Sequence, residues 1–342
     1  MTRPAGVGGF GNRLSWRRQN LALAWRYRRL MPKLMKNYLR VLAGRRVLRG
    51  VEFAITYDCN FNCPHCLTKT LINEARPLLT VEEIINTARQ IDRLGGIYIN
   101  FTGGEPILRG DIFEIVERTA RLPGLLVTLA SNGYALDRHT LSELKRRGLA
   151  MLALSLDGPS PSTHDAMRGF VGSYERVEQV IGLAREIALP VWLTTVVTRE
   201  TLRNGAIAAL AGRTARQGLP LTLNLPYPVG AWEGADVALT DNDYQLYLEL
   251  LAQPHVRWEG SSNWLREGCP AGTEKIYVTP YGDVFPCAVI HRNYGNVREQ
   301  TLADIYRRLG RTPCFDGRRK PCLVAEAPEL WRECLRGDEA DQ

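Results

Sequence analysis

Long apolar segments are absent from this sequence. No stretch approaches 18 consecutive apolar residues, so no segment is expected to cross a membrane as a helix. The amino terminus also lacks the short apolar segment of a secretory signal, and we therefore expect a cytoplasmic protein. Hydrophobic residues make up 45% of the 342 positions and charged residues 23%, which excludes a disordered chain, a collagen or a long coiled coil.

Acidic residues are absent from positions 1–50, which hold 13 of the 44 Lys and Arg residues. The other 292 residues therefore carry 31 bases against 36 acids, and their net charge is −5. A mildly acidic body does not indicate nucleic-acid binding, so no nucleic-acid partner is expected. The overall charge of +8 comes from the first segment.

Cysteine is absent from the 202 residues between Cys66 and Cys269, although the chain has eight cysteines. Three of the eight stand within eight residues, and five lie in the last 74. A secreted disulfide scaffold is shorter and more evenly spaced than this. The clustering therefore favours metal or iron–sulfur binding in an intracellular protein.

Between the two cysteine groups, short apolar segments alternate with helical ones. The expected strands are Val51–Tyr57, Ile97–Thr102, Leu125–Ala130, Ala150–Leu156, Val191–Val197 and Leu221–Leu225. The expected helices are Leu79–Leu94, Asp111–Arg121, Arg138–Arg147, Tyr174–Ile187 and Thr201–Gln217. Six βα units predict a parallel sheet. Because the sixth strand ends near Pro226, we expect an α/β fold with a partial (β/α)6 TIM-like barrel, whose chemistry lies at the carboxyl ends of the strands.

Three cysteines follow the first expected strand. Cys59, Cys63 and Cys66 form a C-x3-C-x2-C loop that brings three thiolates to one point. Three such ligands hold three irons of a [4Fe–4S] cube and leave the fourth iron open. The alternative is a zinc site completed by His65, but this histidine lies between two of the cysteines and is poorly placed to join them.

This loop, following the first strand of a barrel, resembles the hallmark of the radical S-adenosylmethionine (SAM) enzymes, and the resemblance covers roughly residues 50–230. The GGEP motif of that family is matched at the end of the second strand by Thr102, Gly103, Gly104, Glu105 and Pro106. The resemblance implies that this segment binds the SAM amino group and that His65 fills a position that is commonly aromatic. Physically, two glycines permit close backbone approach, Glu105 offers an acceptor, and the proline fixes the turn. The alternative is an ordinary Gly-Gly turn.

Two weaker similarities follow along the chain. Ser131 and Asn132 end the third strand, and the resemblance implies that they contact the ribose and carboxylate of SAM. Ser155, Asp157 and Arg168 belong to a segment similar to the family's S-x-D-G…H…R-G pattern, which implies SAM contacts as well. An Arg fork suits a carboxylate. The alternatives are a plain turn at Asp157 and a solvent-exposed charge at Arg168.

The last third carries a second cysteine signal. Cys269 and Cys287 flank two short β segments that predict a hairpin with a turn at Gly282. This arrangement resembles the SPASM or twitch extension of radical SAM enzymes, which binds auxiliary [4Fe–4S] clusters. The full SPASM pattern has seven cysteines, including a C-x2-C pair that is absent here, so we expect one auxiliary cluster. Its expected ligands are Cys269, Cys287, Cys322 and Cys334, with Cys314 as the alternative to Cys334, and the remaining cysteine is expected to be a buried free thiol.

These features predict three parts: a basic N-terminal helical segment (1–48), a radical SAM core (49–230) and an auxiliary-cluster domain (231–342). Within the first part, Ser15–Leu42 interleaves basic residues with aromatic and apolar ones, and Pro32 interrupts it. We expect this helix to pack across the barrel mouth with its cationic face in solvent. The alternatives are weak contact with a membrane surface and docking of an anionic substrate group or carrier.

The resemblance also implies a reaction. A reduced cluster would cleave SAM to a 5′-deoxyadenosyl radical that abstracts a hydrogen atom from the substrate, with electrons from a donor such as flavodoxin or ferredoxin. The expected substrate is a small secondary metabolite (a sugar, cyclitol or nucleoside), and the outcome oxidation or epimerisation, because we expect no further domain to hold a leader peptide. Alternatives are modification of a ribosomally made peptide, modification of a lipid, and a non-catalytic iron–sulfur or zinc protein.

Overall fold

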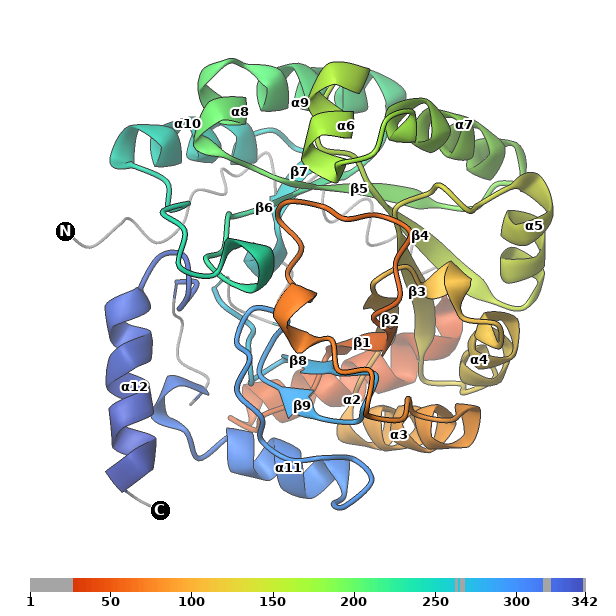
Figure 1. Cartoon of the computed structure of the whole chain (residues 1–342). Helices are drawn as coiled ribbons and strands as arrows, with labels where there is room; N and C mark the ends of the chain where they lie inside the picture. Colours follow the sequence, from red (N-terminus) through yellow and green to blue (C-terminus); the bar gives the residue numbers. More distant parts are fainter. Residues whose placement is uncertain (1–26, 262–263, 265–267, 316–320, 341–342) are drawn as a thin grey trace.

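A single nine-stranded sheet organises the chain (Figure 1). The computed structural model describes residues 27–261, 264, 268–315 and 321–340. The strand order is β7-β6-β5-β4-β3-β2-β1-β8-β9, and neighbouring strands are parallel except for the antiparallel pair β8 and β9. The strands are β1 (Gly50–Thr56), β2 (Tyr98–Gly103), β3 (Leu126–Ser131), β4 (Leu149–Ser155), β5 (Val191–Val196), β6 (Leu221–Asn224), β7 (Val256–Trp258), β8 (Lys275–Val278) and β9 (Val284–Phe285). This open sheet confirms the predicted α/β partial barrel.

Helices surround the curved sheet (Figure 1). They are α2 (Met31–Leu42), α3 (Val81–Leu94), α4 (Ile112–Ala120), α5 (Arg138–Arg146), α6 (Pro161–Arg168), α7 (Ser173–Glu186), α8 (Arg199–Arg203), α9 (Ala206–Gln217), α10 (Asp241–Leu251), α11 (Leu302–Leu309) and α12 (Pro328–Ala340). Helix α3 begins with the capping box of Thr80 and Glu83 and ends at Gly95, whose φ is 109°. Within the described part of the chain, no helix combines the length and apolar content that a membrane span requires.

The six predicted strands agree with the structure to within one residue at each end. One helix prediction was wrong. The segment predicted as Thr201–Gln217 is two helices, α8 and α9, because Gly205 between them takes a φ of 77° and interrupts the helical backbone. Helix α6 was not predicted, although it carries Arg168. Its eight residues are too few for a clear apolar period.

The C-terminal region completes both edges of the same sheet. Strand β7 pairs with β6, and β8 pairs with β1, so Phe53 of β1 lies beside Val278 of β8. The predicted hairpin is confirmed: β8 and β9 are antiparallel, and Gly282 between them has a φ of 94°. The segment that follows Cys287 is thereby placed beside the loop that follows β1.

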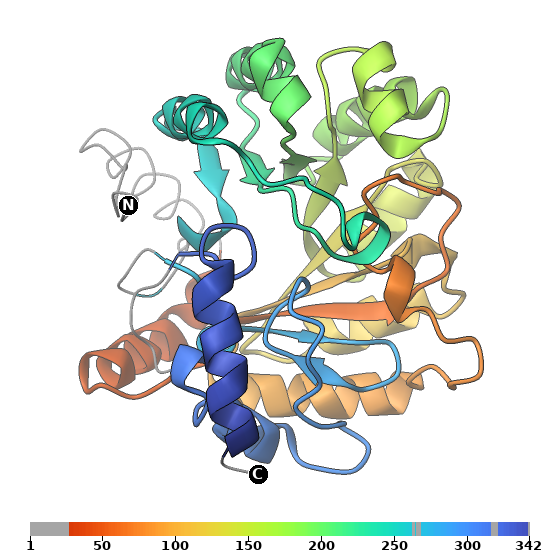
Figure 2. The same cartoon turned by 60° about the vertical axis from the view of Figure 1, so that its left-hand side comes forward.

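Helix α2 corrects our expectation for the basic segment. Residues 15–26 of the predicted helix lie outside the described residues, and the described helix begins at Met31. It lies at the amino ends of the strands and not across the barrel mouth, because Lys33 and Asn37 bond to the carbonyl groups of Gly124 and Gly95, which precede β3 and β2 (Figure 2). The predicted position across the barrel mouth is therefore wrong. Lys33 and Asn37 pack inward, while Arg28, Arg29 and Lys36 are exposed, as expected for the cationic side.

Candidate active site and auxiliary cysteine site

The loop after β1 presents three free thiols. Cys59, Cys63 and Cys66 have no disulfide partner. The Cys66 N–H donates to the Cys63 carbonyl oxygen (3.2 Å), and the Phe61 N–H donates to the Cys59 sulfur (3.4 Å). The Thr68 hydroxyl lies 3.4 Å from the Cys66 sulfur. Turns of the loop backbone and nearby polar hydrogens thus orient the sulfurs without help from regular secondary structure.

Cys59 is exposed, while Cys63 and Cys66 are half-buried. Desolvation of the Cys59 sulfur, together with the nearby Glu105 carboxyl and the thiols of Cys63 and Cys66, raises the pKa of Cys59 to about 11. Thiols that repel one another's charge in this way are held as thiolates when a cationic metal centre neutralises them. The donor set therefore fits a metal cluster.

Glu105 is completely buried beside this loop. Its carboxylate accepts hydrogen bonds from the Asn132 N–H (2.7 Å), the Ser131 hydroxyl (3.0 Å) and the Ile107 N–H (3.3 Å). Burial raises the pKa of Glu105 to about 7, and these three donors oppose that rise. Pro106 is buried as well and begins a short 3-10 helix. A fixed, buried carboxylate of this kind can accept from an ammonium group.

The two glycines before Glu105 allow a close approach to the cysteine loop. A Cβ on Gly103 would lie 2.0 Å from the Thr56 carbonyl oxygen, and one on Gly104 would lie 2.2 Å from that of Asp58. Gly103 also has a φ of 131°. The Gly104 N–H donates to the Thr56 oxygen (2.9 Å), while Thr102 is half-buried at the end of β2. This is more than an ordinary Gly-Gly turn, because the glycines bring it against the loop that carries the cysteines.

Asn132 joins three of the predicted motifs. Its backbone binds Glu105, and its side-chain Nδ2 donates to Asn60 Oδ1 (2.8 Å). Asn60 lies in the cysteine loop and was not predicted as a site residue, since a single asparagine between two cysteines carries no distinctive sequence signal. The structure therefore brings together the cysteine loop, the Gly-Gly-Glu-Pro turn and the end of β3.

Asp157 and Arg168 form a buried ion pair. Asp157 is fully buried, its Oδ2 lies 2.6 Å from Arg168 Nε, and its Oδ1 accepts from the Val196 N–H (3.0 Å). The Arg168 side chain is only 13% exposed, so the alternative of a solvent-exposed charge is wrong. Its guanidinium also donates to the Cys63 sulfur and lowers the pKa of that thiol against the rise from burial. Ser155 is half-buried at the end of β4.

His65 is buried against an aromatic ring and is not arranged as a metal ligand. It is 6% exposed, and its ring centroid lies 5.6 Å from that of Trp232. Burial and the nearby Arg168 lower the pKa of His65 to about 4, so the ring is neutral at pH 7. The part of the chain that the structure describes contains no group of three His, Cys, Asp or Glu side chains close enough to hold a metal ion.

Two groups of contacts escaped prediction from the sequence. Phe61 stacks on Phe170 (4.5 Å between ring centroids), and Tyr134 packs against Phe170 (4.7 Å), which anchors the cysteine loop to two neighbouring loops. On the other side, a Cβ on Gly230 would lie 2.3 Å from the Cys66 carbonyl oxygen. No sequence motif marks these positions, because each contact joins loops that are distant along the chain.

A second set of buried sulfurs lies in the C-terminal region. Cys269, Cys287 and Cys322 are free thiols. Burial raises the pKa of Cys269 and that of Cys287 to about 12 and raises the pKa of Cys322 as well. Charge on the Cys287 sulfur raises the pKa of Cys269, charge on Cys322 raises that of Cys287, and charge on Cys269 raises that of Cys322. The three thiols are therefore neighbours. Each sulfur also accepts hydrogen bonds from two backbone N–H groups, which favour the thiolate. The donors are Ala271, Val289, Ile290, Leu323, Val324 and Ala325.

The expected fourth auxiliary ligand is corrected by the structure. Cys334 on α12 forms a disulfide with Cys314, and their Cα atoms are 5.8 Å apart. Neither sulfur is therefore free to bind iron in this arrangement. The pairing arises because α12 packs along the 3-10 helix Pro313–Phe315, with the Trp331 and Phe315 rings 6.1 Å apart. We also expected the one of these two cysteines that does not bind iron to be a buried free thiol. Because the two pair with each other, that free thiol is absent from the described residues.

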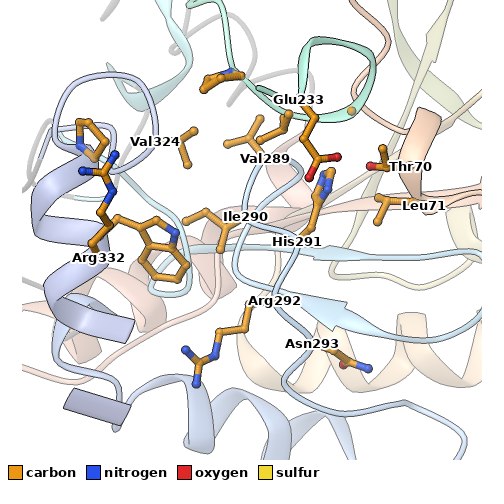
Figure 3. A pocket seen from close by; sticks show the side chains of 15 residues that line it. Thr70, Leu71, Glu233, Val289, Ile290, His291, Arg292, Asn293, Val324 and Arg332 are labelled. Carbon is orange, nitrogen blue, oxygen red and sulfur yellow. The ribbon is translucent and has the colours of Figure 1, made fainter. Parts of the chain in front are cut away.

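A cavity of about 830 Å³ is lined in part by the segments that follow Cys66 and Cys287 (Figure 3). Thr70 and Leu71, just after the first cysteine loop, line one side, and Val289 and His291, just after Cys287, line the other. Its polar groups include a carboxylate beside a histidine and two guanidinium groups. These residues are Glu233, His291, Arg292 and Arg332. The volume is that of a small-molecule binding site.

Comparisons with known proteins identify the class. The sequence model of the Radical SAM superfamily matches residues 53–209, and that of the SPASM iron-sulfur cluster-binding domain matches residues 269–332. The chain is 27% identical to the AdoMet-dependent heme synthase of Methanosarcina barkeri, covering 86% of this chain and 93% of that protein. It is 26% identical to the PqqA peptide cyclase of Rhizobium meliloti, covering 82% and 78%. Its fold is similar to that of Streptococcus suis SuiB bound to S-adenosylmethionine, with a TM-score of 0.63, 16% identity and coverage of 82% and 69%.

The chain therefore belongs to the radical SAM superfamily and carries a SPASM-type C-terminal region. This confirms the resemblance, which rested on the cysteine loop and the Gly-Gly-Glu-Pro turn. Its cofactors are SAM and iron–sulfur clusters. The observed groups fit the chemistry of these cofactors, because they include three mutually repelling thiols, a buried carboxylate and six backbone donors to sulfur.

Proposed function

We propose that Cys59, Cys63 and Cys66 hold the SAM-binding cluster and that Cys269, Cys287 and Cys322 hold one auxiliary cluster. A cluster held by the first three cysteines would supply bound SAM with an electron from a small donor protein such as a flavodoxin or ferredoxin, the chemistry that gives a hydrogen-abstracting 5′-deoxyadenosyl radical. The protein's own part is to bind, to orient and to exclude water.

The residues around Glu105 would position SAM. The Glu105 carboxylate is fixed by the ends of β2 and β3 and would accept from the SAM amino group. Asn132 fixes Glu105 and the cysteine loop together, so the SAM amino group and the cluster would keep one relative position. Phe61, Phe170 and Tyr134 would exclude water from the loop on this side.

We infer that the substrate is a small polar metabolite with an anionic group, bound in the 830 Å³ cavity. One observation carries this inference: the cavity is walled by the segment after Cys66 on one side and by the segment after Cys287 on the other. A molecule held there would contact segments that follow both cysteine sites, an arrangement that a net oxidation would use. Arg332 on the wall pairs with Glu329, Arg292 lies over the Tyr294 ring, and the charge of both suits a carboxylate or phosphate. The similarity to a protein named for heme synthesis is in accord with this, because heme carries carboxylate groups.

Filling the cavity tests this substrate site. Leu71→Trp should abolish the stimulation of 5′-deoxyadenosine formation by candidate substrates, because the indole would occupy the cavity. Slow SAM cleavage without substrate and the iron content should stay as in the parent. Val171→Trp, at a surface position that is 90% exposed, is the matched control. Unchanged stimulation in Leu71→Trp would show that the substrate binds elsewhere.

Modification of a ribosomally made peptide is the second candidate. It is favoured by the similarity to a PqqA peptide cyclase and by the fold shared with SuiB, which has been solved bound to its precursor peptide SuiA. The two candidates are separated by measuring 5′-deoxyadenosine formation with two panels under anaerobic conditions. Stimulation by hemin, sugar acids or nucleotides supports the small-molecule site, and stimulation only by peptides encoded beside the gene supports the second candidate.

A further inference from the structure

Helix α2 presents an apolar stripe to solvent. Its five members stand at positions 31, 35, 38, 39 and 42, a spacing that places them on one helix face. They account for five of the eleven large hydrophobic side chains that are exposed among the described residues. Their exposed fractions are Met31 42%, Met35 58%, Tyr38 42%, Leu39 59% and Leu42 62%. A cluster of exposed apolar side chains of this kind is typical of an interaction surface.

The opposite face of α2 fixes this orientation. Lys33 Nζ binds Asp92 Oδ1 (2.5 Å) and the carbonyl oxygens of Gly96 and Gly124. Asn37 is 1% exposed, and its Nδ2 donates to the Gly95 carbonyl oxygen (2.6 Å). Rotating the helix to bury the stripe would break all of these bonds and leave buried polar groups without partners. Rotation of α2 therefore does not bury the stripe against the described residues.

Charge indicates what covers the stripe. Positions 1–50 hold 13 bases and no acid, and Arg28, Arg29, Lys36 and Arg45 are exposed on and beside α2. Long apolar side chains flanked along the chain by cations and by no acid match the boundary between anionic headgroups and acyl chains. A second copy of the chain is a poor match, because a symmetric contact would oppose one basic segment to the other.

We propose that the stripe on α2 docks the protein on an anionic membrane surface, with the helix lying in the plane of the interface. The partners of Lys33 and Asn37 precede β2 and β3, so this surface lies at the amino ends of the strands (Figure 2). The cavity lies at the opposite, carboxyl ends. Docking would therefore hold the enzyme at a membrane while its substrate site faces the aqueous side.

Vesicle co-sedimentation of the full chain with its clusters tests this proposal. Vesicles of phosphatidylcholine with 30% phosphatidylglycerol should bind the protein, and vesicles of phosphatidylcholine alone should bind it at least tenfold less. Raising salt from 50 to 300 mM should weaken binding several-fold, since screening shortens the reach of the basic residues. Met35→Glu/Leu39→Glu should reduce binding at least tenfold, because two carboxylates would enter the interface.

The control variant introduces two glutamates at exposed apolar positions outside α2. Val171→Glu/Leu246→Glu replaces two exposed apolar residues away from α2 and should leave vesicle binding unchanged. Equal iron content in all three proteins shows that each is folded. The proposal is overturned if the parent ignores anionic vesicles, or if the α2 variant binds them as well as the parent does. It is also overturned if light scattering shows a dimer that the α2 variant abolishes, which would make a second copy the partner.

Discussion

The backbone N–H of Asn132 donates a 2.7 Å hydrogen bond to Glu105 Oε2, which ties the turn after β2 to the end of β3. The Asn132 side chain continues this connection to Asn60 in the cysteine loop. One residue therefore aligns the carboxylate with the loop that would hold the cluster. Small displacements of either group are expected to affect SAM binding and not the fold, because β2 and β3 also pair through their backbones.

Glu105→Gln should weaken SAM binding by about 10- to 100-fold, because a hydrogen bond from an ammonium to a carboxylate is worth more than one to an amide. Iron content should stay unchanged, since no cysteine is altered. Equilibrium binding of SAM to the reconstituted protein measures the effect. Glu82→Gln, on the exposed surface of α3, is the control and should bind SAM as the parent does. Unaltered SAM affinity in Glu105→Gln would leave that carboxylate with a purely structural role.

Iron analysis tests the assignment of the cysteines. The parent should carry roughly eight irons per chain, and Cys59→Ala/Cys63→Ala/Cys66→Ala should retain about four. Replacing Cys269, Cys287 and Cys322 together should also leave about four. Cys314→Ala/Cys334→Ala should keep all eight, because those two sulfurs bond to each other. If this last variant loses half of its iron, one of the pair is an auxiliary ligand after all.

Arg168→Met should destabilise the protein strongly, by about 3–5 kcal/mol, because it leaves the fully buried Asp157 carboxylate without its counter-charge. Adding Asp157→Asn should recover part of this loss. Apparent melting temperature under anaerobic conditions reports both effects. Arg138→Met breaks an exposed pair with Glu186 and should cost less than about 1 kcal/mol. Similar shifts for the two arginine variants would mean that the buried pair contributes no more than a surface one.

Two buried histidines should make stability fall below neutral pH. Burial lowers the pKa of His164 to about 4, and its Nδ1 accepts from the Asp157 N–H (3.0 Å), so the folded protein needs the neutral ring. Since the folded pKa is below the unfolded value of about 6.5, this contribution is complete above pH 6.5 and is lost as pH falls toward 4. His65, with its pKa also lowered to about 4, adds to the same trend.

His164→Asn should retain an acceptor near the Asp157 N–H and remove one of the two titrations. Melting temperatures at pH 7.5, 6.5 and 5.5 should then fall about half as steeply as in the parent, a difference of about 1 kcal/mol at pH 5.5. His139→Asn, at an exposed position, is the control and should keep the slope of the parent. An equal slope in His164→Asn would show that the ring is not held neutral.

Most of the fold could be predicted from the sequence, because its signals are local. The six apolar segments define strands β1 to β6 to within one residue, and the prediction of an open barrel followed from where the sixth ends. Helix boundaries failed where a single residue decided the backbone, as Gly205 does between α8 and α9. The short helix α6 went unseen because eight residues contain too little periodicity.

By itself the sequence determined the fold class, the radical SAM family and the residues of the cysteine loop, since residue spacing along a few positions specifies them. Only the tertiary structure decided which groups meet across long distances in the chain. It buried Arg168 against Asp157, paired Cys314 with Cys334 and turned Lys33 and Asn37 of α2 inward. The reason is physical: exposure, charge pairing and sulfur pairing depend on what packs opposite each side chain, and a helix with one polar and one apolar face does not encode which of the two meets the protein.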